Sequence, residues 1–167
     1  MVLERIKTYG ELVMFSHTLF SLPFALIGML WAAQGLPSIE TIFWILIALV
    51  GARNGANALN RWVDRKIDKK NPRTANRHIP RGIVKGYEVL GIVLFCFSIF
   101  ILAAYKLNPL CFKLTPIALF LFIIYSYTKR FTWACHIVLG IACAGAPVGA
   151  WLAVTGEFAL PPFILEQ

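Results

Sequence analysis

Charged residues are scarce in this sequence. They make up 14% of its 167 residues, whereas a typical soluble domain contains about 25%. Hydrophobic residues make up 59%, and the mean hydropathy is +0.71. This composition excludes a disordered chain and argues against a soluble globule, because few charges remain to cover a surface in water. The composition therefore predicts a protein whose solvent is the lipid bilayer.

The cysteines show no spacing that belongs to a zinc site or to a small disulfide-rich domain. All four lie within or beside apolar segments, at Cys96, Cys111, Cys135 and Cys143. We therefore interpret them as small hydrophobic residues.

Apolar runs recur along the chain at lengths that suit a membrane. A helix needs about 20 apolar residues to cross the bilayer. Five runs approach this length, at about residues 12–33, 39–60, 89–107, 114–127 and 133–154, and the start of a sixth lies at about 158–165. The fold class predicted is all-α, a polytopic transmembrane helix bundle. Two GxxxG pairs, Gly51 with Gly55 and Gly145 with Gly149, predict close approach of helix backbones.

Basic residues gather on one predicted side of the membrane. That side holds thirteen of the sixteen Lys and Arg residues, in the N-terminal segment, the loop at 61–85 and the segment just after residue 128. Lys106 and Lys113 fall on the other side, and Arg53 falls inside a span. The positive-inside rule then predicts a cytoplasmic N-terminus. The net charge of +8 thus fits a membrane topology and indicates no nucleic-acid partner.

A row of polar residues enters the second predicted span. Arg53, Asn57, Asn60, Asp64 and Asp68 follow one another at steps of four, three, four and four, so a helix places them on one face. An ionisable side chain deep in the membrane costs about 2.5–3.5 kcal/mol and normally marks a pathway or a site. A structural ion pair is the alternative explanation for Arg53.

The chemistry of the row indicates its ligand. The carboxylates of Asp64 and Asp68, with the Asn60 amide one turn above, are hard oxygen ligands that suit Mg²⁺. The surrounding Lys and Arg residues suit phosphate oxygens, so the row predicts a diphosphate with an apolar tail as ligand.

Two segments carry a family resemblance, NRWVDRKID at 60–68 and NPRTANRHIPRG at 71–82. They resemble the first aspartate-rich motif and following loop of the UbiA family of membrane prenyltransferases, most closely the 4-hydroxybenzoate polyprenyltransferases and their menaquinone-pathway relatives. Further similar segments are FSHTLFSLPFAL at 15–26, YSYTKRFT at 125–132 and LGIACAGAPVGAW at 139–151. Arg61 stands where many members have Asp.

The resemblance implies a fold of eight or nine transmembrane helices around one cavity, with a second aspartate-rich motif in the C-terminal half. We therefore expect residues 1–167 to be the N-terminal part of a larger enzyme in the bacterial inner membrane. The implied reaction transfers a polyprenyl group from polyprenyl diphosphate to a ring carbon of an aromatic acid such as 4-hydroxybenzoate, in ubiquinone or menaquinone biosynthesis. By resemblance, Mg²⁺ is held by Asn60, Asp64 and Asp68. The implied substrate-binding residues are Arg53, Asn57, Arg77, Tyr125, Lys129 and Arg130.

Several alternatives stay open at the level of sequence. The chain is also compatible with a small transporter or channel, or with a noncatalytic membrane fragment that binds lipid headgroups through its basic loop. The acceptor is alternatively a naphthoate, a porphyrin derivative or another phenol. We interpret His78 as a solvated loop residue, and His17 and His136 as packed membrane residues. Two carboxylates one turn apart beside a basic loop favour the enzyme.

Overall fold

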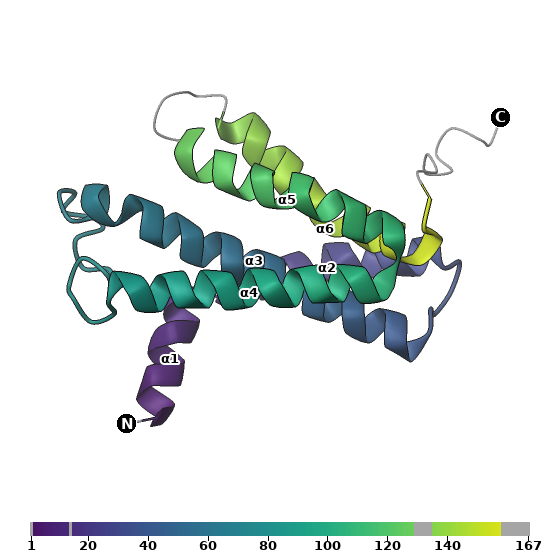
Figure 1. The fold of residues 1–167 in the computed structure, drawn as a ribbon, viewed down its shortest axis with the longest axis horizontal. Helices are drawn as coiled ribbons and strands as arrows, with labels where there is room; N and C mark the ends of the chain where they lie inside the picture. The colour runs from purple at the N-terminus through teal and green to yellow at the C-terminus, as the bar shows by residue number, and fades with distance from the viewer. Residues whose placement is uncertain (1, 14, 129–134, 158–167) are drawn as a thin grey trace.

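The structure is a computed structural model that describes residues 2–13, 15–128 and 135–157. Six helices lie in these ranges: α1 (Val2–Leu12), α2 (Phe15–Ala32), α3 (Ile39–Asp68), α4 (Gly86–Leu107), α5 (Pro109–Thr128) and α6 (Cys135–Thr155). Figure 1 shows α3 and α4 side by side, α5 next to α6, and α1 lying crosswise to the other helices. No strand occurs in the described ranges, so the all-α prediction is confirmed.

Three of these helices, α3, α4 and α5, are long and apolar enough to cross a membrane. Shorter apolar stretches occur at Thr18–Ala32 and Cys143–Thr155, within α2 and α6. The run predicted from about residue 12 is divided in the structure, because α1 ends at Leu12 and α2 begins at Phe15. The run predicted as short, 114–127, lies in a longer helix of 20 residues that begins at Pro109. Proline is well tolerated at this position, because the N–H groups of the first helical turn have no partner within the helix and the one that proline lacks is not missed. The predicted sixth run, 158–165, lies outside the described residues.

The ends of α3 follow from local sequence. Ser38 caps its start, since the Ser38 hydroxyl accepts a hydrogen bond from the Thr41 N–H at 3.1 Å. The helix then runs for 30 residues to Asp68. It ends shortly before Pro72, whose ring disfavours helical backbone at the preceding residue. The loop at 69–85 consequently turns back from the end of α3 toward α4.

Glycines set the closest helix approaches. A Cβ atom placed on Gly51 would lie 2.8 Å from the Cys96 carbonyl oxygen of α4, and one on Gly55 would lie 2.5 Å from the Phe97 ring. The close approach predicted for this GxxxG pair is confirmed. At Gly145 and Gly149, the described residues place no neighbouring atom within 4 Å of such a Cβ, so the described helices do not make the close approach predicted for this pair. Helix α6 instead approaches α2 at Gly28, where an added Cβ would lie 2.6 Å from the Pro147 carbonyl oxygen.

Two clusters of buried apolar residues hold the bundle together. The first lies beside the loop at 69–85 and includes Leu12, Val13, Ala58, Leu59, Val63, Val84, Val89 and Val93. The second joins α2, α3 and α6 and includes Ala25, Met29, Ile45, Leu49, Ala150 and Ala153. The first cluster brings the end of α1, the second half of α3 and the start of α4 together, and so positions the polar row.

Candidate functional site

The polar row lies on the continuous helix α3, as predicted. Arg53 donates to the Cys143 sulfur of α6, with its two terminal nitrogens at 3.9 and 3.8 Å. Asn57 donates to the Val13 carbonyl oxygen at 2.7 Å. The Asn57 amide therefore ties α3 to the junction between α1 and α2, a structural contact that spacing alone did not predict.

A second polar contact on α3 was missed by sequence reasoning. Asn54 is only 8% exposed, and its side-chain oxygen accepts a hydrogen bond from the Thr18 hydroxyl of α2 at 2.8 Å. The signal available in the sequence was a short polar stretch, Ser16 to Thr18, at the start of a largely apolar run. Because buried amides need partners, this pair fixes the register of α2 against α3.

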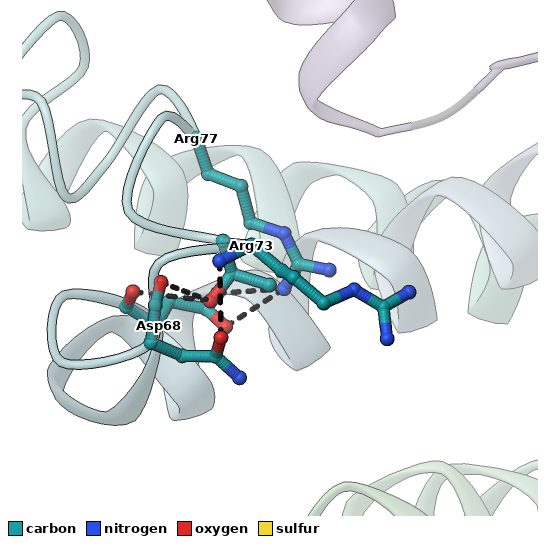
Figure 2. Close-up of polar contacts among 5 residues, drawn as sticks. Asp68, Arg73 and Arg77 are labelled. Atoms are coloured by element: carbon teal, nitrogen blue, oxygen red, sulfur yellow. Dashed lines mark hydrogen bonds and ion pairs between the residues drawn. The ribbon is translucent and has the colours of Figure 1, made fainter.

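Asp68 lies at the end of the row and is buried, with 6% of its surface exposed. Both of its carboxylate oxygens accept hydrogen bonds from Nη1 of Arg77, at 2.8 and 2.7 Å (Figure 2). The Thr74 hydroxyl donates to the Asp68 carbonyl oxygen at 3.0 Å, and the Arg73 N–H donates to the Asn71 side-chain oxygen at 3.0 Å. The basic loop is thus folded back onto the acidic end of α3.

A cavity of about 280 Å³ lies at this end of the bundle. It is lined by Glu11 and Leu12 of α1, by Arg61 and Asp68 of α3, and by loop residues between positions 73 and 80. The His78 ring lies 3.3 Å from the Glu11 carboxylate and links the loop to α1. The interpretation of His78 as a solvated loop residue is therefore wrong, since its side chain is 27% exposed and has an acidic partner.

The donor set on α3 fits a magnesium ion shared with a substrate. No group of three His, Cys, Asp or Glu side chains in the described residues is arranged to hold a metal. Mg²⁺ does not require one, because it is commonly bound by one or two carboxylates together with phosphates and waters. Asn60 and Asp64 are partly exposed on the face that leads to Asp68. The Asp68 carboxylate retains acceptor capacity beside Arg77, because two carboxylate oxygens offer about four lone-pair sites.

The structure describes some of the other predicted site residues and not others. Tyr125 lies partly buried near the end of α5. Lys129 and Arg130 lie outside the described residues, as do the side chains of His17 and His136. Cys96 and Cys111 are free and partly buried, and Cys143 is free and exposed. Cys143 is therefore more than the small hydrophobic residue that the sequence indicated, since it is the acceptor for Arg53.

Comparison with known proteins decides the family. Residues 21–165 match the UbiA prenyltransferase family. The chain belongs to this family. It is 33% identical over 158 residues to the 4-hydroxybenzoate octaprenyltransferase of Vibrio campbellii, covering 92% of this chain and 55% of that protein. It is 36% identical over 162 residues to the protoheme IX farnesyltransferase of Methylococcus capsulatus, covering 93% and 53%.

Solved structures of UbiA homologues share the fold. The apo structure of a homologue from Aeropyrum pernix K1 matches with a TM-score of 0.79 and 32% identity, over 87% of this chain and 52% of that one. A homologue from Archaeoglobus fulgidus, bound to DMAPP and Mg²⁺, matches with a TM-score of 0.75 and 18% identity, over 92% and 56%. The chain spans about half the length of the relatives it matches. The bundle is therefore part of a UbiA fold, and with its three candidate spans the chain is an integral membrane protein.

Proposed function

We propose that this UbiA-family chain forms the N-terminal part of an enzyme that transfers a polyprenyl group from its diphosphate to a ring carbon of an aromatic acid such as 4-hydroxybenzoate. One observation carries the proposal. Asn60, Asp64 and Asp68 form a row of oxygen ligands whose end meets the guanidinium of Arg77, a cation suited to phosphate. The similarity to 4-hydroxybenzoate octaprenyltransferases supports the choice of acceptor.

In this proposal, Asn60, Asp64 and Asp68 would hold Mg²⁺, and the bound ion would supply positive charge to offset the negative charge of the leaving diphosphate. Arg77 uses Nη1 for Asp68, and a guanidinium has five N–H donors. Its other donors are therefore suited to diphosphate oxygens. Lys129 and Arg130 add positive charge for the same group, and Tyr125 offers an aromatic face to the allylic cation.

Arg53 is proposed to bind the carboxylate of the acceptor, with Asn57 one turn along the same face. Arg53 lies seven residues before Asn60 on α3, so it is about 10 Å deeper along a helix that rises about 1.5 Å per residue. Its contact in the structure is the Cys143 sulfur, a weak acceptor that a carboxylate readily replaces. Bound there, the acid directs the ring carbon beside its hydroxyl toward the allylic carbon. The new carbon–carbon bond forms as the bond to diphosphate breaks, and the ring then loses a proton.

A porphyrin is the second candidate acceptor. It is favoured by the 36% identity to a protoheme IX farnesyltransferase. Membranes that contain the protein are incubated with labelled polyprenyl diphosphate and either 4-hydroxybenzoate or protoheme, with Mg²⁺ or with EDTA. We expect Mg²⁺-dependent labelling of 4-hydroxybenzoate. Labelling of protoheme alone would identify the porphyrin, and not the aromatic acid, as the acceptor. Labelling of neither compound would contradict prenyl transfer by this chain and favour the noncatalytic fragment.

The loop predicted at 61–85 begins only after Asp68, because α3 continues to that residue. We also propose that the protein lies in the bacterial inner membrane with the N-terminus, the end of α3 from residue 61 and the loop at 69–85 in the cytoplasm, because thirteen of sixteen basic residues fall on that side. Single cysteines at position 38 and at position 70 test this, in a background without the native cysteines. We expect an impermeant reagent applied from outside to label Ser38→Cys and not Lys70→Cys. The reverse pattern would invert the topology.

A further inference from the structure

Helix α1 carries an apolar face that continues beyond the bundle. Val2, Ile6, Tyr9 and Val13 follow one another at steps of four, three and four, which places them on one face of a helix. The Val13 N–H donates to the Tyr9 carbonyl oxygen at 3.0 Å, so the helical spacing holds to the end of this row. Tyr9 and Val13 pack in the first apolar cluster of the bundle. The first turns of α1 extend away from the bundle (Figure 1), so the apolar face reaches past the protein that covers its end.

The opposite face of α1 is polar and turns toward the loop that follows α3. Glu4 and Glu11 lie seven residues apart, about two turns of helix, and so share this face. The Glu11 carboxylate lies 3.3 Å from the His78 ring of the loop. Residues two positions apart on a helix point about 200° apart, so Glu11 lies opposite Tyr9 and Val13. The packed end of α1 therefore fixes its rotation, with the polar face toward the loop and the apolar face toward the spans.

Helix α1 lies at the level where the spans begin. Its buried end shares the first apolar cluster with Val89 and Val93, in the first turns of α4. Helix α4 is long and apolar enough to cross a membrane, and its first turns also expose Tyr87, Leu90 and Leu94. Exposed apolar side chains on a span face lipid, and tyrosine is enriched where lipid meets water. Because α1 runs crosswise to the bundle helices at this level (Figure 1), its axis lies along the membrane surface.

We propose that α1 is an interfacial helix, with the face of Val2, Ile6, Tyr9 and Val13 immersed at the boundary between lipid headgroups and acyl chains. Amphipathic helices of this kind bury their apolar face about 5–10 Å into that boundary. The occupant of the face is lipid, because the face and the exposed apolar surface of α4 lie at the same level of the membrane. The two acidic and two basic residues of α1 balance, so apolar contact and not headgroup charge holds the helix.

This placement gives a physical reason for the break between α1 and α2. The chain runs along the membrane surface to Leu12 and enters the bilayer from Phe15. Since Glu11 and His78 join α1 to the loop after α3, the interfacial helix also sets the height of that loop above the lipid. The inference requires that the bundle spans a membrane, and it does not depend on prenyl transfer.

The first experimental arm measures the depth of single nitroxide labels in the full chain, reconstituted in phosphatidylcholine vesicles without its native cysteines. Electron paramagnetic resonance compares collisions with oxygen, which concentrates in lipid, and with a nickel chelate, which stays in water. We expect Ile6→Cys to lie about 5–10 Å below the phosphate level. The matched control is Glu4→Cys, two residues away on the opposite face, which we expect to lie in water. Equal water access at both positions would overturn the proposal. Low collision rates with both reagents at position 6 would also overturn it, because a protein surface and not lipid would then cover the face.

The second arm repeats the measurement in vesicles that also contain phosphatidylglycerol. We expect the depth of Ile6→Cys to stay unchanged, because the charges of α1 balance. Immersion in the anionic vesicles alone would contradict the role of the apolar face and assign binding to Arg5 and Lys7. If Ile6→Cys loses its helical circular dichroism, Val2→Cys decides, since position 2 lies one turn earlier on the same face. Prenyl transfer enters neither arm, so a failure here leaves the proposed reaction intact.

Discussion

The two halves of α3 carry different kinds of side chain on the side that faces away from the core. In the first half, Ile45 and Leu49 pack into the bundle, and apart from Glu40 in the first turn the exposed side chains are apolar, as at Ile39 and Phe43. In the second half, Ala58 is buried among apolar neighbours, but the other side carries the polar row from Arg53 to Asp68. A membrane helix normally exposes apolar residues to lipid. The first half therefore serves packing alone, and the second half combines packing with a binding face.

The strongest test of this difference compares the acidic residues at the two ends of α3. In a form of the protein that transfers prenyl groups, Asp64→Asn is expected to lower kcat about 100-fold or more, because a group that stabilises developing charge is lost. Glu40→Gln removes an exposed carboxylate from the first turn and should leave kcat unchanged. Both are measured from product formation at saturating substrates and Mg²⁺.

Retention of most activity in Asp64→Asn would contradict the assignment of the second half as a metal-binding face. Asp68→Asn is a less clean probe, because it also alters the pair with Arg77. For this reason Asp64 is the better choice, and the stability of each variant in detergent is recorded beside its rate.

The second test concerns the middle of α3, where the backbone of α4 comes closest. Gly51→Ala is expected to lower the free energy of unfolding by about 1–3 kcal/mol, because its Cβ meets backbone atoms that cannot easily move. Gly145→Ala in the other GxxxG pair adds a Cβ where no other atoms lie within 4 Å. It should be neutral or stabilising by up to about 1 kcal/mol, from helix propensity. Unfolding in detergent micelles by added SDS measures both, and equal losses would mean that α6 packs more closely than described.

The helices and the polar row were predictable because both follow from local periodicity. A step of three or four residues fixes a face of a helix, whatever packs against it. The break between α1 and α2 was not predictable, because the apolar sequence continues through it. Nor were the contacts of Asn57 with Val13 and of His78 with Glu11, since these join segments far apart in the sequence. The two GxxxG pairs have the same sequence pattern, but only Gly51 lies against a neighbouring helix and Gly145 does not. Contacts between helices, which the local pattern does not contain, make this difference.

The third test separates the two proposed substrates within the second half of α3. Arg53→Lys keeps the positive charge and loses the planar pair of donors that matches a carboxylate. We expect KM for the aromatic acid to rise about tenfold, equivalent to about 1.4 kcal/mol, and KM for polyprenyl diphosphate to change less than about twofold. Steady-state kinetics with each substrate varied in turn measures both constants. A defect mainly in KM for the diphosphate would exchange the two proposed subsites.

The smallest expected effect lies at the start of α3, far from the polar row. Ser38 accepts a hydrogen bond from the Thr41 N–H at 3.1 Å, which satisfies one of the N–H groups that a helix leaves unpaired at its start. Ser38→Ala is expected to lower the free energy of unfolding by about 1 kcal/mol. Ser38→Asp keeps an acceptor at the cap and should restore stability to within a few tenths of a kcal/mol. Neither variant should change kcat, because the first half of α3 carries none of the proposed ligands.

Equal destabilisation by both variants in thermal unfolding would show that the cap hydrogen bond does not stabilise α3. A fall in kcat with unchanged stability would show that the two halves of the helix are coupled.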